Sequence, residues 1–370
     1  MKTPQDLKVA LVCDWLTSIG GAERVVLELH RLFPDAPIYT SQYDPVAMPW
    51  FADAVIHTSK LQKIPKSLKK FLPVLRAWSF SRLDLSEYDL VISSSGAEAK
   101  SIHFKEPTKH ICYCHAPTHY YWSRYEAYKQ NPGFPKGFNW LARLGLIGLV
   151  KPLRTWDFHA AQKPTFLVTN STHSQAMIRE YYQRDSFVIH PPVDIERFHT
   201  ASKKSVKRHG FLIVGRQTPY KRIDLAVNAC SQLNLPLTVI GNGPEHDKLR
   251  SIAGPTITFL TNVDDHEITK YFQQAEAFIF PGIDDFGIVS VESLANGTPV
   301  IAYKAGGALD YVVSKKTGVF FDKQSVESLV EALKSFGNQS FNNTEIREFA
   351  KQFSQDNFRK NILSFINQNL

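Results

Sequence analysis

Short apolar segments alternate with helix-like stretches along the whole chain. This alternation is typical of strand–helix–strand units, in which parallel strands are covered by helices. We therefore predict an α/β protein built on parallel sheets. In the first half, the predicted strands are Lys8–Asp14, Ala54–Thr58, Tyr88–Ser93, His110–His115, Thr165–Asn170 and Phe187–His190. In the second half, they are Phe211–Gly215, Leu237–Gly241, Ile257–Leu260, Ala277–Phe280, Pro299–Tyr303 and Gly318–Phe321.

The strand pattern is interrupted between these two sets. Pro191 and Pro192 begin the interruption, and the basic, strand-free segment Ala201–His209 continues it. A chain of 370 residues is long for one core and suits two domains. We predict two Rossmann-like doubly wound domains, residues 1–190 and 191–352, that face each other across a cleft. Ligands of such sheets bind beyond the carboxyl ends of the strands.

The composition disfavours a membrane-spanning, secreted or disulfide-bonded protein. No run approaches the ~18–20 apolar residues of a membrane span, and the N-terminus lacks the apolar region of a signal peptide. The four cysteines, Cys13, Cys112, Cys114 and Cys230, follow no disulfide or zinc pattern. Cys112 and Cys114 alternate along a predicted strand, so we expect them in the core. A reducing, cytoplasmic compartment is expected.

The net charge of +8 is concentrated in two stretches that are also rich in apolar residues. Seven basic residues and no acid lie between Lys60 and Arg82. Phe138–Trp156 likewise mixes aromatic and aliphatic residues with Arg143, Lys151 and Arg154. Such stretches favour the surface of an anionic bilayer, here the inner face of the cell membrane. The alternative is a solvated basic helix face. Nucleic acid is not an expected partner, because no binding motif accompanies the charge.

The segment from Phe278 to Glu292 has the pattern of a ligand site. A predicted strand ends in a Pro-Gly turn, Asp284 follows, and a helix then carries Glu292. The start of a helix offers backbone N–H groups to an anion, and carboxylates bind sugar hydroxyls. This combination indicates a nucleotide-sugar site. The alternative is an ordinary strand–turn–helix in which Glu292 is a solvated residue.

Three further strand ends carry candidate ligand-binding residues. Gly20 and Gly21 open a helix and permit close approach of a phosphate, although many such pairs are simple turns. Arg216 and Lys221 follow a strand and suit a diphosphate; the alternative is a basic surface. His115 ends a strand before a proline loop, where it can bind a substrate hydroxyl or serve as a core histidine.

Taken together, these segments resemble a retaining glycosyltransferase of family 4, with the GT-B fold. Within that family the chain is most similar to bacterial mannosyltransferases of O-antigen and exopolysaccharide assembly, through the phrases at 219–224, 285–288 and 304–309. The residues that carry the resemblance are Gly20-Gly21-Ala-Glu, His115, Val193-Asp194…Phe198, Gly215-Arg216…Lys221, Gly241-Asn-Gly-Pro, Asp284…Glu292 and Gly297-Thr-Pro-Val-Ile.

The resemblance implies a role for each part of the chain. Residues 1–190 would bind the acceptor, residues 191–352 the nucleotide-sugar donor, and residues 353–370 would form a helix that crosses back to the first domain. In the donor site, Arg216 and Lys221 would bind the diphosphate, and Glu292 the ribose hydroxyls. The implied donor-sugar contacts are Asp284, His115 and the backbone N–H groups of Phe286, Gly287 and Ile288, while Gly20 and Gly21 would close over the phosphates.

Two positions depart from the family pattern. Asp284 stands where the family usually has Glu, and His119 stands where close relatives often carry Arg. The resemblance implies a hexose donor, with GDP-mannose expected and a UDP-hexose or another GDP-sugar as the alternative. The implied acceptor is a glycan or a polyprenyl-linked sugar, in cell-surface glycan biosynthesis.

The resemblance further implies no cofactor and no metal. The alternative to a metal-free site is that one of the acidic pairs, Asp264-Asp265 or Asp284-Asp285, forms a metal-binding motif. A sugar-nucleotide epimerase and a non-catalytic nucleotide- or glycan-binding protein are the competing functions.

Overall fold

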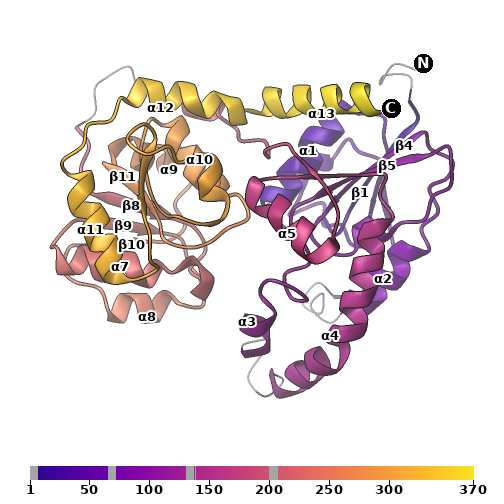
Figure 1. Ribbon diagram of the computed structural model, residues 1–370, viewed down its shortest axis with the longest axis horizontal. Helices are drawn as coiled ribbons and strands as arrows, with labels where there is room; N and C mark the ends of the chain where they lie inside the picture. The colour runs from indigo at the N-terminus through magenta and orange to yellow at the C-terminus, as the bar shows by residue number, and fades with distance from the viewer. Residues whose placement is uncertain (1–6, 66–71, 131–136, 138, 200–206) are drawn as a thin grey trace. The chain divides into compact units, whose positions relative to one another are not determined.

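The computed structural model describes residues 7–65, 72–130, 137, 139–199 and 207–370. Contacts divide the chain into two compact units. The first unit comprises residues 1–191 together with Phe358–Leu370, and the second comprises residues 192–357. Each unit contains one parallel sheet (Figure 1). The prediction of two Rossmann-like α/β domains is confirmed.

The first unit is built on a seven-stranded sheet with the strand order β3-β2-β1-β4-β5-β6-β7. All neighbouring strands are parallel. The strands are β1 Val9–Cys13, β2 Ile38–Thr40, β3 Ile56–Thr58, β4 Leu90–Ser95, β5 Lys109–Cys114, β6 Phe166–Thr169 and β7 Phe187–Val188. The helices are α1 Gly21–Leu32, α2 Pro73–Ser81, α3 Tyr125–Gln130, α4 Asn139–Gln162 and α5 Thr172–Tyr182, joined by most of α13, Gln355–Asn369.

Both faces of this sheet are covered, as β1 illustrates. Leu11 and Cys13 pack into the core beneath α1 and α13, whereas Ala10 and Val12 pack on the opposite face. Every residue of β1 is buried, which is the pattern of a strand with helices on both sides. Cys112 and Cys114 are also buried, as predicted for core residues.

Helix α13 contributes four buried side chains to the core of the first unit: Phe358, Ile362, Phe365 and Ile366. The ring of Phe365 packs against Phe166 and Phe187, at centroid distances of 5.7 and 4.9 Å. Arg359 forms an ion pair with Glu28 of α1, whose side chain is 1% exposed. The helix is therefore an integral part of the first unit.

The second unit is built on a six-stranded parallel sheet with the order β10-β9-β8-β11-β12-β13. Phe278 and Phe280 of β11 face one core cluster, and Ala277 and Ile279 face the other. The strands are β8 Phe211–Val214, β9 Leu237–Ile240, β10 Ile257–Leu260, β11 Ala277–Phe280, β12 Val300–Tyr303 and β13 Gly318–Phe321. The helices are α6 Glu196–His199, α7 Ile223–Gln232, α8 His246–Ser251, α9 Asp265–Gln274, α10 Ile288–Ala295, α11 Val326–Phe336 and α12 Asn343–Ala350.

The strand order reverses between β1 and β4 in the first unit and between β8 and β11 in the second. At such a switch point, loops on the two sides diverge and leave room for a ligand at the carboxyl ends of the strands. The segments after β1, β8 and β11 carry Gly20, Gly21, Arg216, Lys221 and Asp284. The fold therefore places most of the predicted site residues at switch points.

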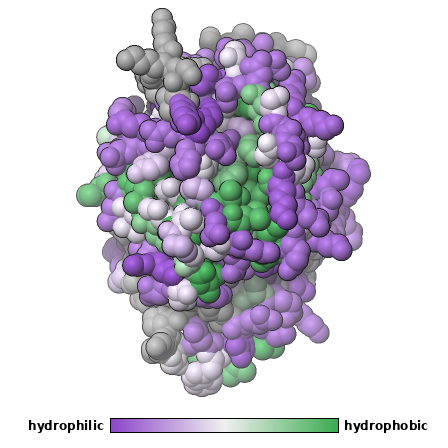
Figure 2. Space-filling view, turned by 90° about the vertical axis from the view of Figure 1, so that its left-hand side faces the viewer, coloured by the Kyte–Doolittle hydropathy of each residue, from purple (hydrophilic) through white to green (hydrophobic). Residues whose placement is uncertain are grey.

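The surface of the second unit on the side of α7, α8 and α11 is mostly hydrophilic around a central group of hydrophobic residues (Figure 2). In the part of the chain that the structure describes, no helix combines the length and the apolar character needed to cross a membrane.

Candidate functional site

The loop between β11 and α10 depends on glycine at its last position. Gly287 precedes α10 with a φ of +94°, a conformation that residues with a Cβ rarely adopt. A Cβ at this position would also lie 2.5 Å from the hydroxyl oxygen of Tyr311. Phe286 is buried and packs against the rings of Tyr311 and Phe353, at 5.6 Å from each. This packing fixes the start of α10, where Phe286, Gly287 and Ile288 are predicted to offer N–H groups.

The glycine pair 306–307 supports the same loop from the neighbouring strand end. The Gly307 N–H donates to the Asp284 carbonyl over 2.9 Å. A Cβ at Gly307 would lie 2.3 Å from Cα of Phe286. The two loop backbones therefore approach each other closely at this pair, which holds Asp284 in place.

Each of the two predicted carboxylates is paired with a cation from a different segment of the second unit. Asp284 forms an ion pair with Lys221, the last residue of η5 (Pro219–Lys221), which follows β8. Glu292, on the second turn of α10, lies 3.2 Å from the guanidinium of Arg197 in α6. The structure thus brings Asp284 and Lys221 together. The sequence did not indicate Arg197 as a site residue, although it lies within the Val193…Phe198 segment of the resemblance.

Arg216 occupies a rigid loop at the carboxyl end of β8. A Cβ at Gly241 would lie 2.3 Å from the Gly215 carbonyl oxygen, so glycine lets the loop after β9 pack directly on it. Gln217 reinforces this contact, because its side-chain amide donates to the Gly241 carbonyl over 2.8 Å. The Arg216 side chain itself is exposed. Its guanidinium is therefore accessible to a diphosphate from solvent.

His115, in the first unit, directly follows β5 and is half-buried. Its Nε2 lies 2.8 Å from Oγ of Ser94, on the adjacent strand β4. Its carbonyl oxygen accepts hydrogen bonds from Asn170 and Ser174. His110, at the other end of the same strand, is the core histidine. Burial lowers the pKa of His110 to about 3, so that its ring is neutral.

Gly20 and Gly21 begin α1 after the first strand. Gly20 has an extended backbone with a φ of −159°, which any residue can adopt. A Cβ there would lie 2.8 Å from Oε2 of Glu23, whose side chain is buried. The backbone conformation at position 20 therefore does not require glycine.

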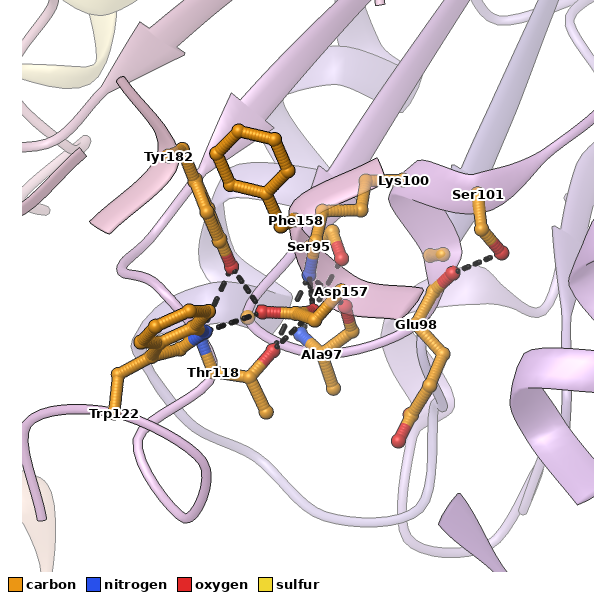
Figure 3. A network of polar contacts seen from close by, with 12 residues as sticks. Ser95, Ala97, Glu98, Lys100, Ser101, Thr118, Trp122, Asp157, Phe158 and Tyr182 are labelled. Carbon is orange, nitrogen blue, oxygen red and sulfur yellow. Dashed lines mark hydrogen bonds and ion pairs between the residues drawn. The ribbon is translucent and has the colours of Figure 1, made fainter. Parts of the chain in front are cut away.

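The loop that follows His115 is tied to the body of the first unit by a buried polar network (Figure 3). The carboxylate of Asp157, on α4, accepts hydrogen bonds from Thr118, Trp122 and Tyr182 over 2.7–2.9 Å. Lys100 of η4 (Ala99–Ser101) lies 2.6 Å from the same carboxylate. Burial opposes the charged form of Lys100, but Asp157 and neighbouring polar groups raise its pKa well above the ordinary value. The network thus anchors the loop through a charged pair that is fully buried.

A second buried ion pair holds the same loop. Glu98, before η4, accepts hydrogen bonds from Arg76 of α2 over 2.8 and 3.3 Å and from the Tyr120 hydroxyl over 2.7 Å. His119, which lies between these anchor points, contacts Ser123 over 2.8 Å. Residues 116–122 are therefore fixed from two sides, and His115 sits at the start of a rigid segment.

The structure gives Asp264 a local role, because its carboxylate accepts from the N–H of Glu267 at the start of α9. Within the described ranges, no three His, Cys, Asp or Glu side chains converge as metal ligands would.

Comparison with known proteins places the second unit in a family. Residues 194–355 match the family described as "Glycosyl transferases group 1". An alignment 170 positions long shows 29% identity to the GDP-mannose-dependent alpha-(1-6)-phosphatidylinositol monomannoside mannosyltransferase of Mycobacterium tuberculosis H37Rv, covering 39% of this chain and 44% of that protein. The alignments to the leading curated relatives span less than half of each relative's length. Residues 194–355 thus form a glycosyl transferases group 1 domain.

Solved structures resemble almost the whole chain. The Anabaena protein Alr3699/HepE in complex with UDP has a TM-score of 0.70 and 15% identity, covering 98% of this chain and 100% of that one. The lipopolysaccharide outer core galactosyltransferase WaaB has a TM-score of 0.68 and 16% identity, covering 98% and 99%. This likeness establishes the fold, which is the predicted GT-B fold.

Proposed function

We propose that this protein is a retaining glycosyltransferase that transfers a hexose from a nucleotide sugar to a glycan or lipid-linked acceptor. One observation carries the proposal. At the switch point of the second sheet, the loop after β11 and helix α10 present two carboxylates, and each is held by a cation from another segment. This arrangement lies within the residues that match the glycosyl transferase family.

The second unit is proposed to bind the donor. Arg216 and Lys221 bind the diphosphate, because guanidinium and ammonium groups form strong charged hydrogen bonds with phosphate oxygens. Asp284 binds a hydroxyl of the donor sugar, beside the N–H groups of Phe286 to Ile288, and Glu292 binds the ribose. Lys221 is then shared between Asp284 and the diphosphate, which links recognition of the sugar to recognition of its leaving group.

The first unit is proposed to bind the acceptor and to complete the donor site. His115 contacts the donor sugar near its reacting carbon, and Gly20 and Gly21 approach the phosphates. The acceptor oxygen bonds to the anomeric carbon on the face from which the diphosphate departs, and the acceptor proton passes to a departing phosphate oxygen. The protein contributes positioning and electrostatic stabilisation of the diphosphate.

GDP-mannose is the proposed donor. Support comes from the mycobacterial relative, whose name describes a GDP-mannose-dependent mannosyltransferase, and from the phrases that resemble bacterial mannosyltransferases. A UDP-sugar is the alternative, because the Anabaena protein of similar fold was solved with UDP. The proposed setting is cell-surface glycan biosynthesis, including O-antigen or exopolysaccharide assembly.

We further propose that the first unit binds an anionic membrane surface at the inner face of the cell membrane. Helix α4 exposes a series of large apolar side chains, each 44–64% exposed, and α2 exposes three more at 46–54%. Lys60, Lys63, Arg143 and Lys151 add positive charge, which attracts anionic lipid headgroups. The apolar side chains are Trp140, Leu141, Leu144, Ile147 and Leu149 on α4 and Val74, Leu75 and Trp78 on α2. Lys66, Lys69, Lys70 and Phe138, which belong to the predicted basic–apolar stretches, lie outside the described residues.

The membrane proposal is tested by vesicle flotation. Replacing Lys60 and Lys63 with Gln is expected to weaken binding to vesicles that contain phosphatidylglycerol, and replacing Trp140 and Leu144 with Ser is expected to weaken it further. Replacing Lys315 and Lys316 of the second unit with Gln removes the same charge and serves as the control. If both variants of the first unit bind the vesicles as strongly as the wild-type protein does, the membrane proposal is wrong.

The donor proposal is tested by thermal stabilisation with GDP, UDP, ADP and their common sugar derivatives, with and without EDTA. Stabilisation by GDP and GDP-mannose that persists in EDTA supports a metal-independent mannosyltransferase. Stronger thermal stabilisation by UDP than by GDP would make a UDP-sugar the proposed donor, and the proposed transfer reaction would be unchanged. No response to any nucleotide overturns the proposal. Product that forms without an acceptor would instead indicate an epimerase.

A further inference from the structure

We propose that Arg197 is a positioning residue for Glu292. In this view Arg197 keeps the Glu292 carboxylate charged and oriented, so that it accepts hydrogen bonds from the ribose hydroxyls of the nucleotide. The inference rests on the proposed function, because the ribose belongs to the proposed donor.

Burial of Glu292 is the first observation. The residue is 6% exposed on the second turn of α10, and a carboxylate at such a position needs a compensating charge. Arg197 supplies that charge, with its Nη2 atom 3.2 Å from Oε1 of Glu292. The positive charge of the guanidinium favours the charged form of the carboxylate, and its N–H groups donate to the carboxylate oxygen.

Arg197 is itself anchored by residues outside α10. Its backbone N–H donates to Asp194 over 3.4 Å, and its guanidinium lies 4.5 Å from the centre of the Phe198 ring. Phe198 is 3% exposed and packs against Phe272 in the core. The N–H of Val193 donates to the Phe353 carbonyl over 2.9 Å, which fixes the start of the segment. The guanidinium therefore approaches Glu292 from a rigid support.

The geometry of the pair orients the carboxylate. The Arg197 contact is made to one identified oxygen of Glu292, Oε1. The guanidinium therefore fixes the direction in which this oxygen points. An arginine that only neutralised a buried charge would stabilise the unit but would not distinguish nucleotides with and without ribose hydroxyls.

The test compares GDP with 2′,3′-dideoxy-GDP, using the full chain and calorimetric titration. The matching UDP pair is used if UDP stabilises the wild-type protein more. Arg197→Met is expected to weaken GDP binding about tenfold, as for loss of one charged hydrogen bond. Binding of the dideoxy nucleotide should change less than twofold. The double variant Arg197→Met/Glu292→Gln should bind GDP no more weakly than Glu292→Gln alone, because both changes remove the same interaction.

Two further variants separate positioning from folding. Arg347→Met removes another arginine contact to α10, at the carbonyl of Asn296, and should affect both nucleotides equally or not at all. Arg197→Lys keeps the positive charge and replaces Arg197→Met in the test if that variant does not fold. Arg197→Lys should still bind the dideoxy nucleotide as the wild-type protein does. Equal weakening toward both nucleotides, or no weakening, overturns the inference while the proposed function stands. Failure of the wild-type protein to bind any nucleoside diphosphate overturns the proposed function itself.

Discussion

Lys221 and Asp284 form an ion pair within the second unit, although they lie 63 positions apart and follow different strands. Their side chains are 22% and 17% exposed, so a ligand can reach the pair. Without a donor, the carboxylate offsets the charge that is proposed to bind the diphosphate. Removal of the Lys221 charge should therefore weaken binding of a nucleoside diphosphate, whereas removal of the Asp284 charge should not.

Replacing Lys221 with Met should weaken binding of the favoured nucleoside diphosphate about tenfold or more, because a charged hydrogen bond contributes ~1.5–3 kcal/mol. Asp284→Asn removes the competing carboxylate and should leave that affinity unchanged or higher, while transfer of the sugar falls. Calorimetric titration with GDP and UDP measures both. Lys304→Met, which removes an exposed lysine 3.6 Å from Asp322, is the control. Equal weakening by the Lys221 and Asp284 variants would contradict the shared-cation interpretation.

Gly287→Ala should destabilise the protein by at least ~1 kcal/mol, because the position combines a positive φ with a clash against Tyr311. The matched change Gly145→Ala lies in an open part of α4, where nothing is within 4 Å of the added methyl group. That change should be neutral or stabilise by up to about 1 kcal/mol, since alanine is the better helix former. Urea unfolding measures both free energies. Similar free energies of unfolding for the two variants would mean that the backbone before α10 accommodates alanine without loss of stability.

Lys100→Met should lower the free energy of unfolding by about 3–5 kcal/mol, because it leaves Asp157 charged and buried without its cation. The exposed pair Arg179–Asp185, with side chains 79% and 87% exposed, provides the contrast. Arg179→Ala should cost less than about 1 kcal/mol. A Lys100→Met cost as small as that of Arg179→Ala would show that the network in Figure 3 contributes little to stability.

His110 should make the stability of the protein fall as the pH is lowered from about 6.5 toward 3. Its pKa in the folded state is about 3, because burial disfavours the imidazolium and the charge of Lys163 acts in the same direction. In the unfolded chain its pKa is about 6.5. Between these values only the unfolded chain binds the proton, so stability rises with pH by about 1.4 kcal/mol per unit.

The variant His110→Gln isolates this contribution. Its urea unfolding at pH 5 and pH 7.5 should show a smaller pH dependence than that of the wild type. The hydrogen bond to Ser93, 2.8 Å long in the wild type, can be kept by the glutamine side chain. An unchanged pH dependence would place the ring of His110 in contact with solvent.

The sequence predicted the parts of this structure that depend on local patterns. Buried strands such as β11 appear as apolar runs next to glycine and proline, and both sheets follow from them. Strand β2, Ile38–Thr40, was not predicted from the sequence. Its place beside β1 depends on partners that lie elsewhere in the chain.

The candidate site was predictable as a set of residue types, but not as a set of contacts. His110 and His115 lie on one predicted strand, and only the structure separates the buried ring from the half-buried one. The pairing of Arg197 with Glu292 joins residues 95 positions apart. Lys100 and Asp157 are likewise distant, and a lysine or an aspartate gives no local signal of burial. Such pairs depend on the tertiary fold, which spacing in the sequence does not encode.

The position of α13 at the end of the chain affects the order in which the two units can fold during synthesis. Its residues Phe358 to Leu370 complete the first unit, yet they leave the ribosome after every residue of the second. A nascent chain can therefore finish the second unit while the first still lacks Phe358, Ile362, Phe365 and Ile366 from its core. Residues 7–191 expose an apolar surface next to α1 during that interval, when a chaperone has its main opportunity to bind.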